Sequence, residues 1–395
     1  MKTEYDIIVV GAGLVGLTTA LSCAQSGASV ALLDRREITA GTDSRVSALS
    51  TTSLRLFKNL GVDIAGASQP IRDMLVTDGE PNSPWRLHFE GDSETAGESD
   101  LGAVIENPLL KAALIQRLDQ TDTIDLFAPA SVENFETDTG GVSVDIGETE
   151  LRARLLIAAD GRDSSLRKQA GITVQRFNYD ASSLVTLISH EHPHDGLAWQ
   201  RLIKGGALAV LPLTGHRSQI VWSGPAHAIT AACALADTDF IALLAEKMDG
   251  YLGDMQCTAP RKSYPLRLQV ADSFSAGRVA LAGDAAHVIH PLAGQGLNLG
   301  LRDAAALAAG VHSARDTGQD IGVAGVLDYG LWRNTDTRAF GALTHALSQS
   351  SASEMGPIGH IRRLGLSMLN RSPAAKSALK KRAAGEAQDL PDLMK

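Results

Sequence analysis

The chain has 395 residues, of which 44% are hydrophobic and 21% are charged. These proportions are typical of a globular protein and exclude a disordered chain, a coiled coil and a collagen-like fibre. Acidic residues outnumber basic ones by 45 to 36, the reverse of the balance that most nucleic-acid-binding proteins show, so we expect no nucleic-acid partner. The 3 cysteines are scattered, which is typical of a reducing compartment and argues against a disulfide framework or a structural zinc site.

The start of the chain is polar and has no secretory signal architecture. No apolar run reaches the roughly 18 to 20 residues that would span a bilayer. We therefore expect a cytoplasmic protein, and attachment to the inner face of the membrane from the cytoplasmic side stays open.

The first 34 residues predict a strand–helix–strand unit. Residues 6–10 form a continuously apolar run typical of a buried strand, residues 17–26 predict a helix, and residues 29–33 predict a second strand. Between the first strand and the helix lies a GxGxxG motif formed by Gly11, Gly13 and Gly16, and Asp34 ends the second strand. This context indicates a dinucleotide site, with the pyrophosphate at the helix N-terminus and Asp34 on the adenosine ribose. The motif alone does not separate FAD from NAD.

The next segments alternate between helix and strand signals. Helices are predicted over residues 50–60 and 107–118, and strand-like runs over 74–76, 85–89 and 124–159. Residues 91–102 are rich in Gly, Ser, Asp and Glu and predict a loop. The apolar run 155–159 ends at Asp160 and Gly161, which predict a tight turn before a helix.

From about residue 172 to 270 the texture changes to alternating strand-like segments, with a helical insertion near 226–248. This pattern predicts a second domain built on an antiparallel sheet. The strand 278–282 then leads into Gly283 and Asp284, and long helices are predicted over 295–314 and about 321–350. Between 361 and 382 the chain carries seven basic residues and no acid, and we expect this tail to be helical.

The stretch 290–303 reads His-Pro-Leu-Ala-Gly-Gln-Gly-Leu-Asn-Leu-Gly-Leu-Arg-Asp. Its glycines free backbone N–H groups ahead of a long helix, and the helix dipole adds positive potential, so the place suits an anionic ring. His290 invites assignment as a general base, but we favour a structural role for it and for His287. No cluster of His, Asp and Glu in the sequence suggests a metal site.

Together these motifs resemble the FAD-dependent aromatic hydroxylases of the para-hydroxybenzoate hydroxylase type. Within that class the chain is most similar to the ubiquinone-biosynthesis hydroxylases, the UbiH/UbiF/VisC group, whose signature the 290–303 stretch fits at every fixed position. The resemblance covers about the first 345 residues. It implies an α/β fold with a Rossmann-like FAD-binding domain, an antiparallel-sheet substrate domain and a helical C-terminal tail.

The resemblance also implies domain boundaries. The FAD-binding domain would comprise residues 1–72, 103–172 and 276–345. The substrate-binding sheet would comprise residues 73–102 and 173–275, and residues 346–395 would form the basic helical segment.

The resemblance assigns roles to the motif residues. Arg45 would lie near flavin and pyrophosphate, Asp284 would bind the ribityl hydroxyls, and Arg167 would support the Asp-Gly motif without touching ligand. No catalytic base is assigned, and His290 and Pro291 are the candidates adjacent to the flavin. The full set of expected FAD-binding residues is Gly11, Gly13, Gly16, Asp34, Arg45, Asp160, Gly161, Gly283, Asp284, Pro291, Gly294, Gln295, Gly296 and Asn298.

The activity implied is an NAD(P)H- and O2-dependent monooxygenation of an aromatic ring through a C4a-hydroperoxyflavin, with a prenylated phenol of ubiquinone biosynthesis as substrate. Alternatives remain open at this point. They are a soluble phenol or aromatic acid, for which Arg201 or Arg217 would bind the acid; reduction of a prenyl chain; and a flavin-bearing component of a ubiquinone-biosynthesis complex. The basic tail would contact lipid headgroups or a protein partner.

Overall fold

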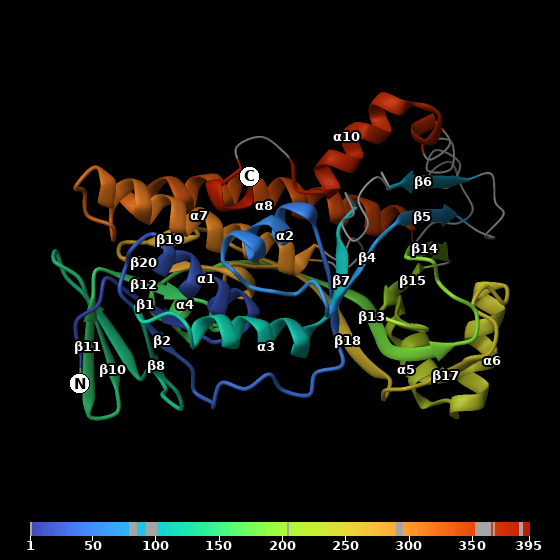
Figure 1. The fold of residues 1–395 in the computed structure, drawn as a ribbon, viewed down its shortest axis with the longest axis horizontal. Helices are drawn as coiled ribbons and strands as arrows, with labels where there is room; N and C mark the ends of the chain where they lie inside the picture. Colours follow the sequence, from blue (N-terminus) through green and yellow to red (C-terminus); the bar gives the residue numbers. More distant parts are fainter. Residues whose placement is uncertain are drawn as a thin grey trace.

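The fold is taken from a computed structural model of the chain. It describes residues 2–78, 85–91, 101–203, 205–289, 295–351, 365, 368–386 and 390–395, with the backbone alone for 343–351 and 383. Within this part of the chain two large sheets lie at opposite ends of the molecule, and long helices run along one side of it (Figure 1).

A parallel sheet carries the first motif. Its central strand β1 pairs in parallel with β12 on one side and β2 on the other, because all three are apolar on both faces. The strand order is β19-β20-β12-β1-β2-β8. The bounds are β1 Ile7–Val10, β2 Val30–Leu33, β8 Ile124–Phe127, β12 Leu155–Ala158, β19 Ser275–Ala276 and β20 Val279–Leu281.

Helix α1 packs directly on this sheet, in contact with β1, β2 and β8. The long α7 packs against α1 on one side and α8 on the other, and α1 also contacts α3. A short 3-10 turn, η1, follows β20. The bounds are α1 Leu14–Gln25, α2 Thr51–Asn59, α3 Asn107–Leu118, α4 Ser165–Gln169, η1 Gly283–Ala285, α7 Gly296–Asp316 and α8 Ala324–Ser351.

The second large sheet is mostly antiparallel. Its strand order is β21-β18-β13-β16-β15-β14-β5-β6, with β17 paired to β13 and with β14 parallel to β5. The bounds are β5 Asp73–Asp78, β6 Arg86–Glu90, β13 Val174–His190, β14 Leu197–Ile203, β15 Gly206–Leu213, β16 Arg217–Pro225, β17 Met255–Cys257, β18 Lys262–Ala271 and β21 His287–Val288.

One face of this sheet is covered by α5 (Ala226–Ala234) and α6 (Asp237–Met248). Leu184, Trp199, Leu208, Val210 and Ile220 form the apolar core beneath them. Because side chains alternate along a strand, the residues between these positions point to the opposite face, where Leu187, Ala198 and Leu213 cluster with Ile71 and Val104.

Two small antiparallel sheets complete the described strands. The first links the two large sheets and the second lies beside the chain start, as Figure 1 shows. Their bounds are β3 Val46–Leu49, β4 Ser68–Pro70 and β7 Ala103–Glu106 for the first, and β9 Asn134–Thr137, β10 Val142–Ile146 and β11 Thr149–Ala153 for the second.

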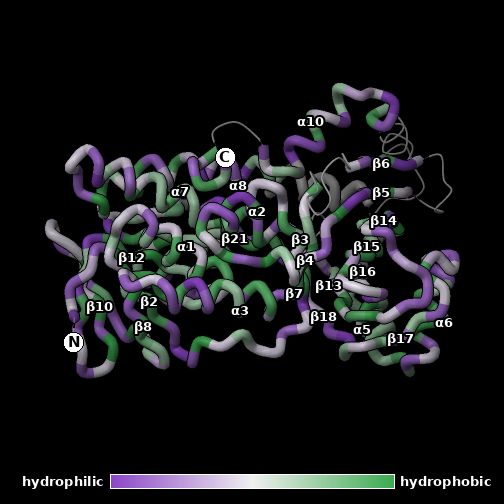
Figure 2. The backbone as a smooth tube through the Cα atoms, in the orientation of Figure 1, coloured by the Kyte–Doolittle hydropathy of each residue, from purple (hydrophilic) through white to green (hydrophobic). Residues whose placement is uncertain are grey.

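The C-terminal part folds back onto the body of the molecule. Helix α10 (Pro373–Ala383) stands out beside β6, and hydrophobic and hydrophilic residues interleave along it (Figure 2). The final turn η3 (Asp392–Met394) then packs against α2 and α7. The α/β class and the helical tail expected from sequence are confirmed.

Several predicted element bounds were wrong. The first helix begins at Leu14 instead of residue 17, because Gly13 with φ −76° and ψ 179° is its N-cap and Gly16 lies in its first turn. Within the region of strand-like segments, β13 is a single 17-residue strand with an irregular register between Asn178 and Ser182. The helical insertion predicted near 226–248 is present and consists of the two helices α5 and α6.

Candidate flavin site

The first glycine motif is shaped by close backbone contacts. A Cβ added to Gly16 would lie 1.7 Å from the carbonyl oxygen of Gly11, whereas a Cβ added to Gly13 would meet nothing within 4 Å. Gly16 is therefore required for packing of helix against strand. The space beside Gly13, at an N-terminus without a side-chain cap and without an acid in its first turn, fits a phosphate.

Asp34 is anchored to that motif. One carboxylate oxygen accepts from the Ala12 N–H at 2.7 Å, and the other accepts from the Arg36 N–H at 2.9 Å. Lys111 on α3 lies within electrostatic range of Asp34, and burial lowers the pKa of Lys111. Sequence patterns gave no signal for Lys111, because the neighbourhood is made by packing of α3 beside the second strand.

The N-termini of α1 and α7 converge on the turn at Gly283. A Cβ on Gly300 of α7 would lie 2.6 Å from the Val15 side chain of α1 and 3.2 Å from the Gly283 Cα. Helix α7, like α1, has no side-chain cap and no acid in its first turn, and a Cβ on Gly296 would meet nothing within 4 Å. Two helix N-termini with open glycines therefore face the same region, which favours binding of an anionic group there.

Asp284 lies at this convergence. Its side chain is exposed and forms no hydrogen bond within the described residues, yet surrounding protein atoms remove enough water to raise the pKa of its carboxyl. The charges of His287, Arg45 and Arg162 act in the opposite direction. An unpaired carboxylate held in this way fits the hydroxyl groups of a sugar-like chain.

Arg45 bridges the parallel-sheet region and the large antiparallel sheet. Its guanidinium pairs with Asp43 at 2.6 Å, and its Cζ lies 6.0 Å from the ring centroid of Tyr264 on β18. The pKa of Arg45 is raised, first by its hydrogen bond to Asp43 and also by the charge of Asp284. Arg45 thus lies between Asp284 and the sheet face opposite α5 and α6.

The Asp-Gly turn lies directly beside the first glycine motif. One oxygen of Asp160 accepts from the Ser165 N–H at 2.9 Å and so caps α4, while its other oxygen is buried without a partner among the described residues. Arg167 is buried and donates to the carbonyl oxygens of Arg162 and Ala285. This geometry agrees with the supporting role expected for Arg167.

Asn298, one of the expected FAD-binding residues, is held by three side-chain hydrogen bonds within the protein, and its flavin contact stays a prediction. Its amide donates to the Ala48 carbonyl at 2.9 Å and accepts from the Ser50 N–H at 3.0 Å and from the Ser53 hydroxyl at 2.8 Å. The side chain is therefore engaged in joining α7 to α2. Gln295 begins α7 beside it.

Part of the predicted site lies outside the described residues. His290, Pro291 and Gly294 fall there, so their assignments stay predictions. Among the described residues, no group of His, Cys, Asp and Glu is placed to hold a metal ion. None of the described helices is both long and apolar enough to cross a membrane.

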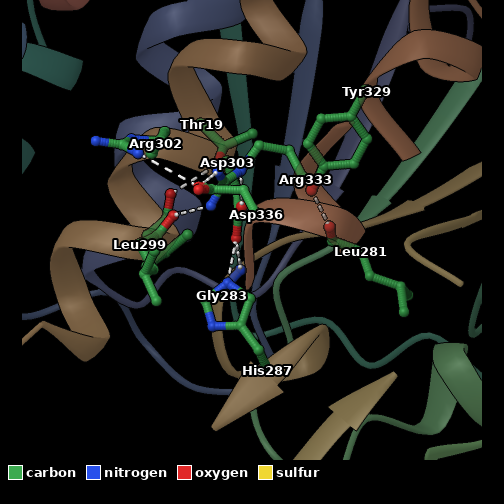
Figure 3. A network of polar contacts seen from close by, with 11 residues as sticks. Thr19, Leu281, Gly283, His287, Leu299, Arg302, Asp303, Tyr329, Arg333 and Asp336 are labelled. Carbon is green, nitrogen blue, oxygen red and sulfur yellow. Dashed lines mark hydrogen bonds and ion pairs between the residues drawn. The ribbon is translucent and has the colours of Figure 1, made fainter. Parts of the chain in front are cut away.

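Behind Asp284 lies a buried polar network that sequence reasoning missed (Figure 3). Asp303 accepts from the Gly283 N–H at 3.0 Å, from His287 Nε2 at 2.7 Å and from Arg333 Nε at 2.8 Å. Burial acts to raise the pKa of Asp303, but His287 and Arg333 outweigh it and the pKa is lowered. The aspartate ends the 290–303 motif, which was the signal that could have found it. Arg333 lies 30 residues further along the chain, and no sequence motif points to it.

Solved structures with this fold define the class. The chain superposes on p-nitrophenol 4-monooxygenase PnpA from Pseudomonas putida with a TM-score of 0.79 at 19% identity, covering 97% of this chain and 98% of that one. It superposes on Klebsiella pneumoniae HpxO, solved with FAD and uric acid, with a TM-score of 0.71 at 20% identity, covering 96% of each chain. The fold is that of the FAD-dependent aromatic hydroxylases.

Sequence comparison identifies the family within this class. The family described as FAD binding domain matches residues 4–318. The chain is 36% identical to ubiquinone hydroxylase UbiL of Rhodospirillum rubrum, covering 96% of this chain and 89% of that one. It is 30% identical to the 3-demethoxyubiquinol 3-hydroxylase of Escherichia coli, covering 96% and 98%. The chain therefore belongs to the family of FAD-dependent monooxygenases that includes the ubiquinone hydroxylases. FAD is its cofactor and NAD(P)H its co-substrate.

Proposed function

We propose that this protein hydroxylates the aromatic ring of a prenylated phenol on the way to ubiquinone. The supporting relatives are named as hydroxylases or monooxygenases of ubiquinone biosynthesis. FAD, when bound, supplies the transfer of one oxygen atom from O2 after reduction by NAD(P)H. The protein's own residues would hold that group and position an apolar substrate above it.

The observation that carries the substrate class is the sheet face opposite α5 and α6. Val185, Val221 and Ala209 lie opposite one another on three adjacent strands, and all three remain partly exposed. Leu211 is partly exposed on the same face, and Tyr264 of the neighbouring strand meets Arg45. This apolar row would exclude water and contact a hydrocarbon substrate.

Other apolar residues of β14 and β15 do not contribute to this face. Val210 is buried in the core beneath α5 and α6, and Ile203 packs against that core, because the alternation of side chains sends them to the other face.

The two arginines that would suit an acidic substrate are already engaged. Arg201 donates to the Lys247 carbonyl and pairs with Asp249, both at the end of α6. Arg217 pairs with Glu106 at 2.8 Å. These contacts favour a neutral phenol over an aromatic acid.

We assign the flavin contacts as the motifs predict, with the pyrophosphate beside Gly13 and the ribityl chain on Asp284. The open space at Gly13 and Gly296 and the unpaired carboxylate of Asp284 support this assignment. The division into an FAD-binding domain and a sheet domain stays part of the same proposal.

The experiment is the quinone profile of a strain that lacks this gene, measured by mass spectrometry of lipid extracts. The proposal expects a prenylphenol intermediate one oxygen short, restored to ubiquinone by the wild-type gene but not by D284N. Full restoration by a D284N protein that fails to bind FAD would instead support a component without turnover of its own. A normal profile in the deletion strain would contradict the proposal.

We also propose that residues 368–382, which include most of α10, contact the membrane that holds such a substrate. Lys381 on α10 is exposed, and so are Arg371 and Met368 (72%), which precede α10 in the chain. Cationic residues with an exposed apolar neighbour are typical of segments that lie on anionic lipid. The basic residues at 362 and 363 fall outside the described residues.

Liposome flotation tests this contact. Charge reversal by R371E/K381E is expected to reduce flotation with anionic vesicles, whereas K58E/K168E, with the same change of net charge elsewhere, should float like wild type. Equal flotation of both double variants would contradict a lipid contact through residues 368–382.

A further inference from the structure

Helix α8 reaches the turn that carries Asp284 at two points. The hydroxyl of Tyr329 donates to the Leu281 carbonyl. One helical turn later, Arg333 donates to Asp303 at 2.8 Å, and Asp303 in turn accepts from the Gly283 N–H at 3.0 Å. Figure 3 shows both lines of contact converging on the same short segment.

The arginine's place in this network is specific. Its side chain is fully buried, and besides Asp303 it donates to Asp336 at 2.5 Å and to the Leu299 carbonyl at 3.4 Å. Arg302 also pairs with Asp336, at 3.3 Å, so the charges of two carboxylates and two guanidiniums balance. A planar fork makes these contacts simultaneously, and a lysine cannot reproduce them.

The anchored groups flank Ala282, so they fix the backbone directly before Asp284. Residues 281 and 283 are held by their carbonyl and N–H groups, respectively. A shift of this turn would also disturb the contact of Gly283 with Val15 in the first glycine motif. Helix α8 can therefore influence the position of Asp284 without itself contacting the flavin.

We propose that Tyr329 and Arg333 are positioning residues, which hold the Leu281–Gly283 turn so that the Asp284 carboxylate meets the FAD ribityl chain. The inference rests on the flavin contact of Asp284 proposed above. In metal sites, loss of a group that orients a ligating residue typically weakens binding by about 10- to 100-fold, and we expect a comparable effect behind Asp284. R333K should therefore weaken FAD binding by about 10-fold or more, and Y329F, which removes one hydroxyl, should weaken it less.

The test is the FAD dissociation constant of the apoprotein, titrated by flavin fluorescence, alongside the apoprotein's thermal midpoint. The matched control is R278K. Arg278 is likewise buried and paired with Asp320 at 2.6 Å, but it lies at the end of β20 away from Asp284. R278K is expected to lower the thermal midpoint while leaving FAD affinity within about twofold, since it removes no group behind the flavin contact.

The double variant D284N/R333K identifies the route of action. Because Arg333 acts through Asp284 in this account, the double variant should bind FAD no more weakly than D284N alone. Wild-type FAD affinity in R333K and Y329F, or equal weakening by R278K, would overturn the proposal. If R333K does not fold, Y329F alone decides it. Unchanged affinity in D284N would instead overturn the flavin contact of Asp284 and the inference with it.

Discussion

Asp284 and Asp303, which lie at and next to the Gly283 turn, ionise with opposite consequences for folding. Crowding by protein atoms raises the pKa of Asp284, so its ionised form costs stability as pH rises above its ordinary range near 3.8. Burial also disfavours the ionised form of Asp303, but His287 and Arg333 lower its pKa. The stability that Asp303 contributes is therefore present above pH 3.8 and is lost as pH falls below it.

The signs can be tested on the apoprotein. At neutral pH, D284N is expected to raise the free energy of unfolding, whereas D303N should lower it by about 3–5 kcal/mol, the usual cost of breaking a buried ion pair. In denaturant titrations at several pH values, the D284N difference should shrink as the pH falls toward 3.8, whereas the D303N difference should persist to about that pH and shrink only below it. A D284N apoprotein less stable than wild type at pH 7 would contradict this reading of Asp284.

Two glycines of the first motif differ in the space around them: Gly16 is closely packed and Gly13 is open. G16A places a Cβ 1.7 Å from a backbone oxygen and should destabilise the apoprotein by about 1–3 kcal/mol or more. G13A fills open space, so it should leave apoprotein stability within about 0.5 kcal/mol while weakening FAD binding. Calorimetry of the apoprotein and FAD titration separate the two. Equal stability losses in both variants would count against a phosphate beside Gly13.

Contacts between residues close in sequence could be predicted, and contacts between distant residues could not. The spacing of Gly11, Gly13, Gly16 and Asp34 is local, and it correctly predicted a glycine turn between strand and helix with the aspartate beside it. The partnership of Asp303 with Arg333 joins different helices, so no spacing rule could find it. Asn298 illustrates a third case, since its motif was visible but its side-chain partners were not.

At the scale of elements, local periodicity predicted the strand–helix–strand unit and α3, whose bounds 107–118 match the structure. The linking strands β3, β4 and β7 were missed. Each has only three or four residues, and they pair across long sequence separations, so their formation depends on tertiary contacts.

The C-terminal element is held by the body of the molecule. The Ala384 carbonyl accepts from the N–H and hydroxyl of Thr52 at the start of α2, and Arg302 donates to the Gly385 carbonyl at 2.6 Å. Met394 is fully buried between α2 and α7. The chain end is thus a structural part of the layer formed by α2 and α7.

Truncation of one buried side chain tests this role. M394A should lower the free energy of unfolding by about 2–5 kcal/mol, the usual range for a buried methionine. M368A, at a position that is 72% exposed, should change it by less than about 0.5 kcal/mol. Urea denaturation of both variants makes the comparison, and equal midpoints would contradict the docked chain end.

At the scale of the whole molecule, the proposed flavin site at the Gly283 turn and the apolar face of the antiparallel sheet lie on opposite sides of Arg45. Arg45 lies between them, in contact with Tyr264 and in electrostatic range of Asp284. The change to alternating strand-like segments near residue 172 was visible in the sequence. Which side chains of these strands are exposed could not be predicted, because it depends on which side of the sheet α5 and α6 cover.

The most direct measurement supplies the purified FAD-loaded protein with NADPH, a short-chain prenylated phenol and O2 labelled with a heavy oxygen isotope. The account predicts a product with one added oxygen on the ring, carrying the heavy isotope, and no product without O2. A reduced prenyl chain formed without O2, or a ring oxygen derived from water, would contradict it.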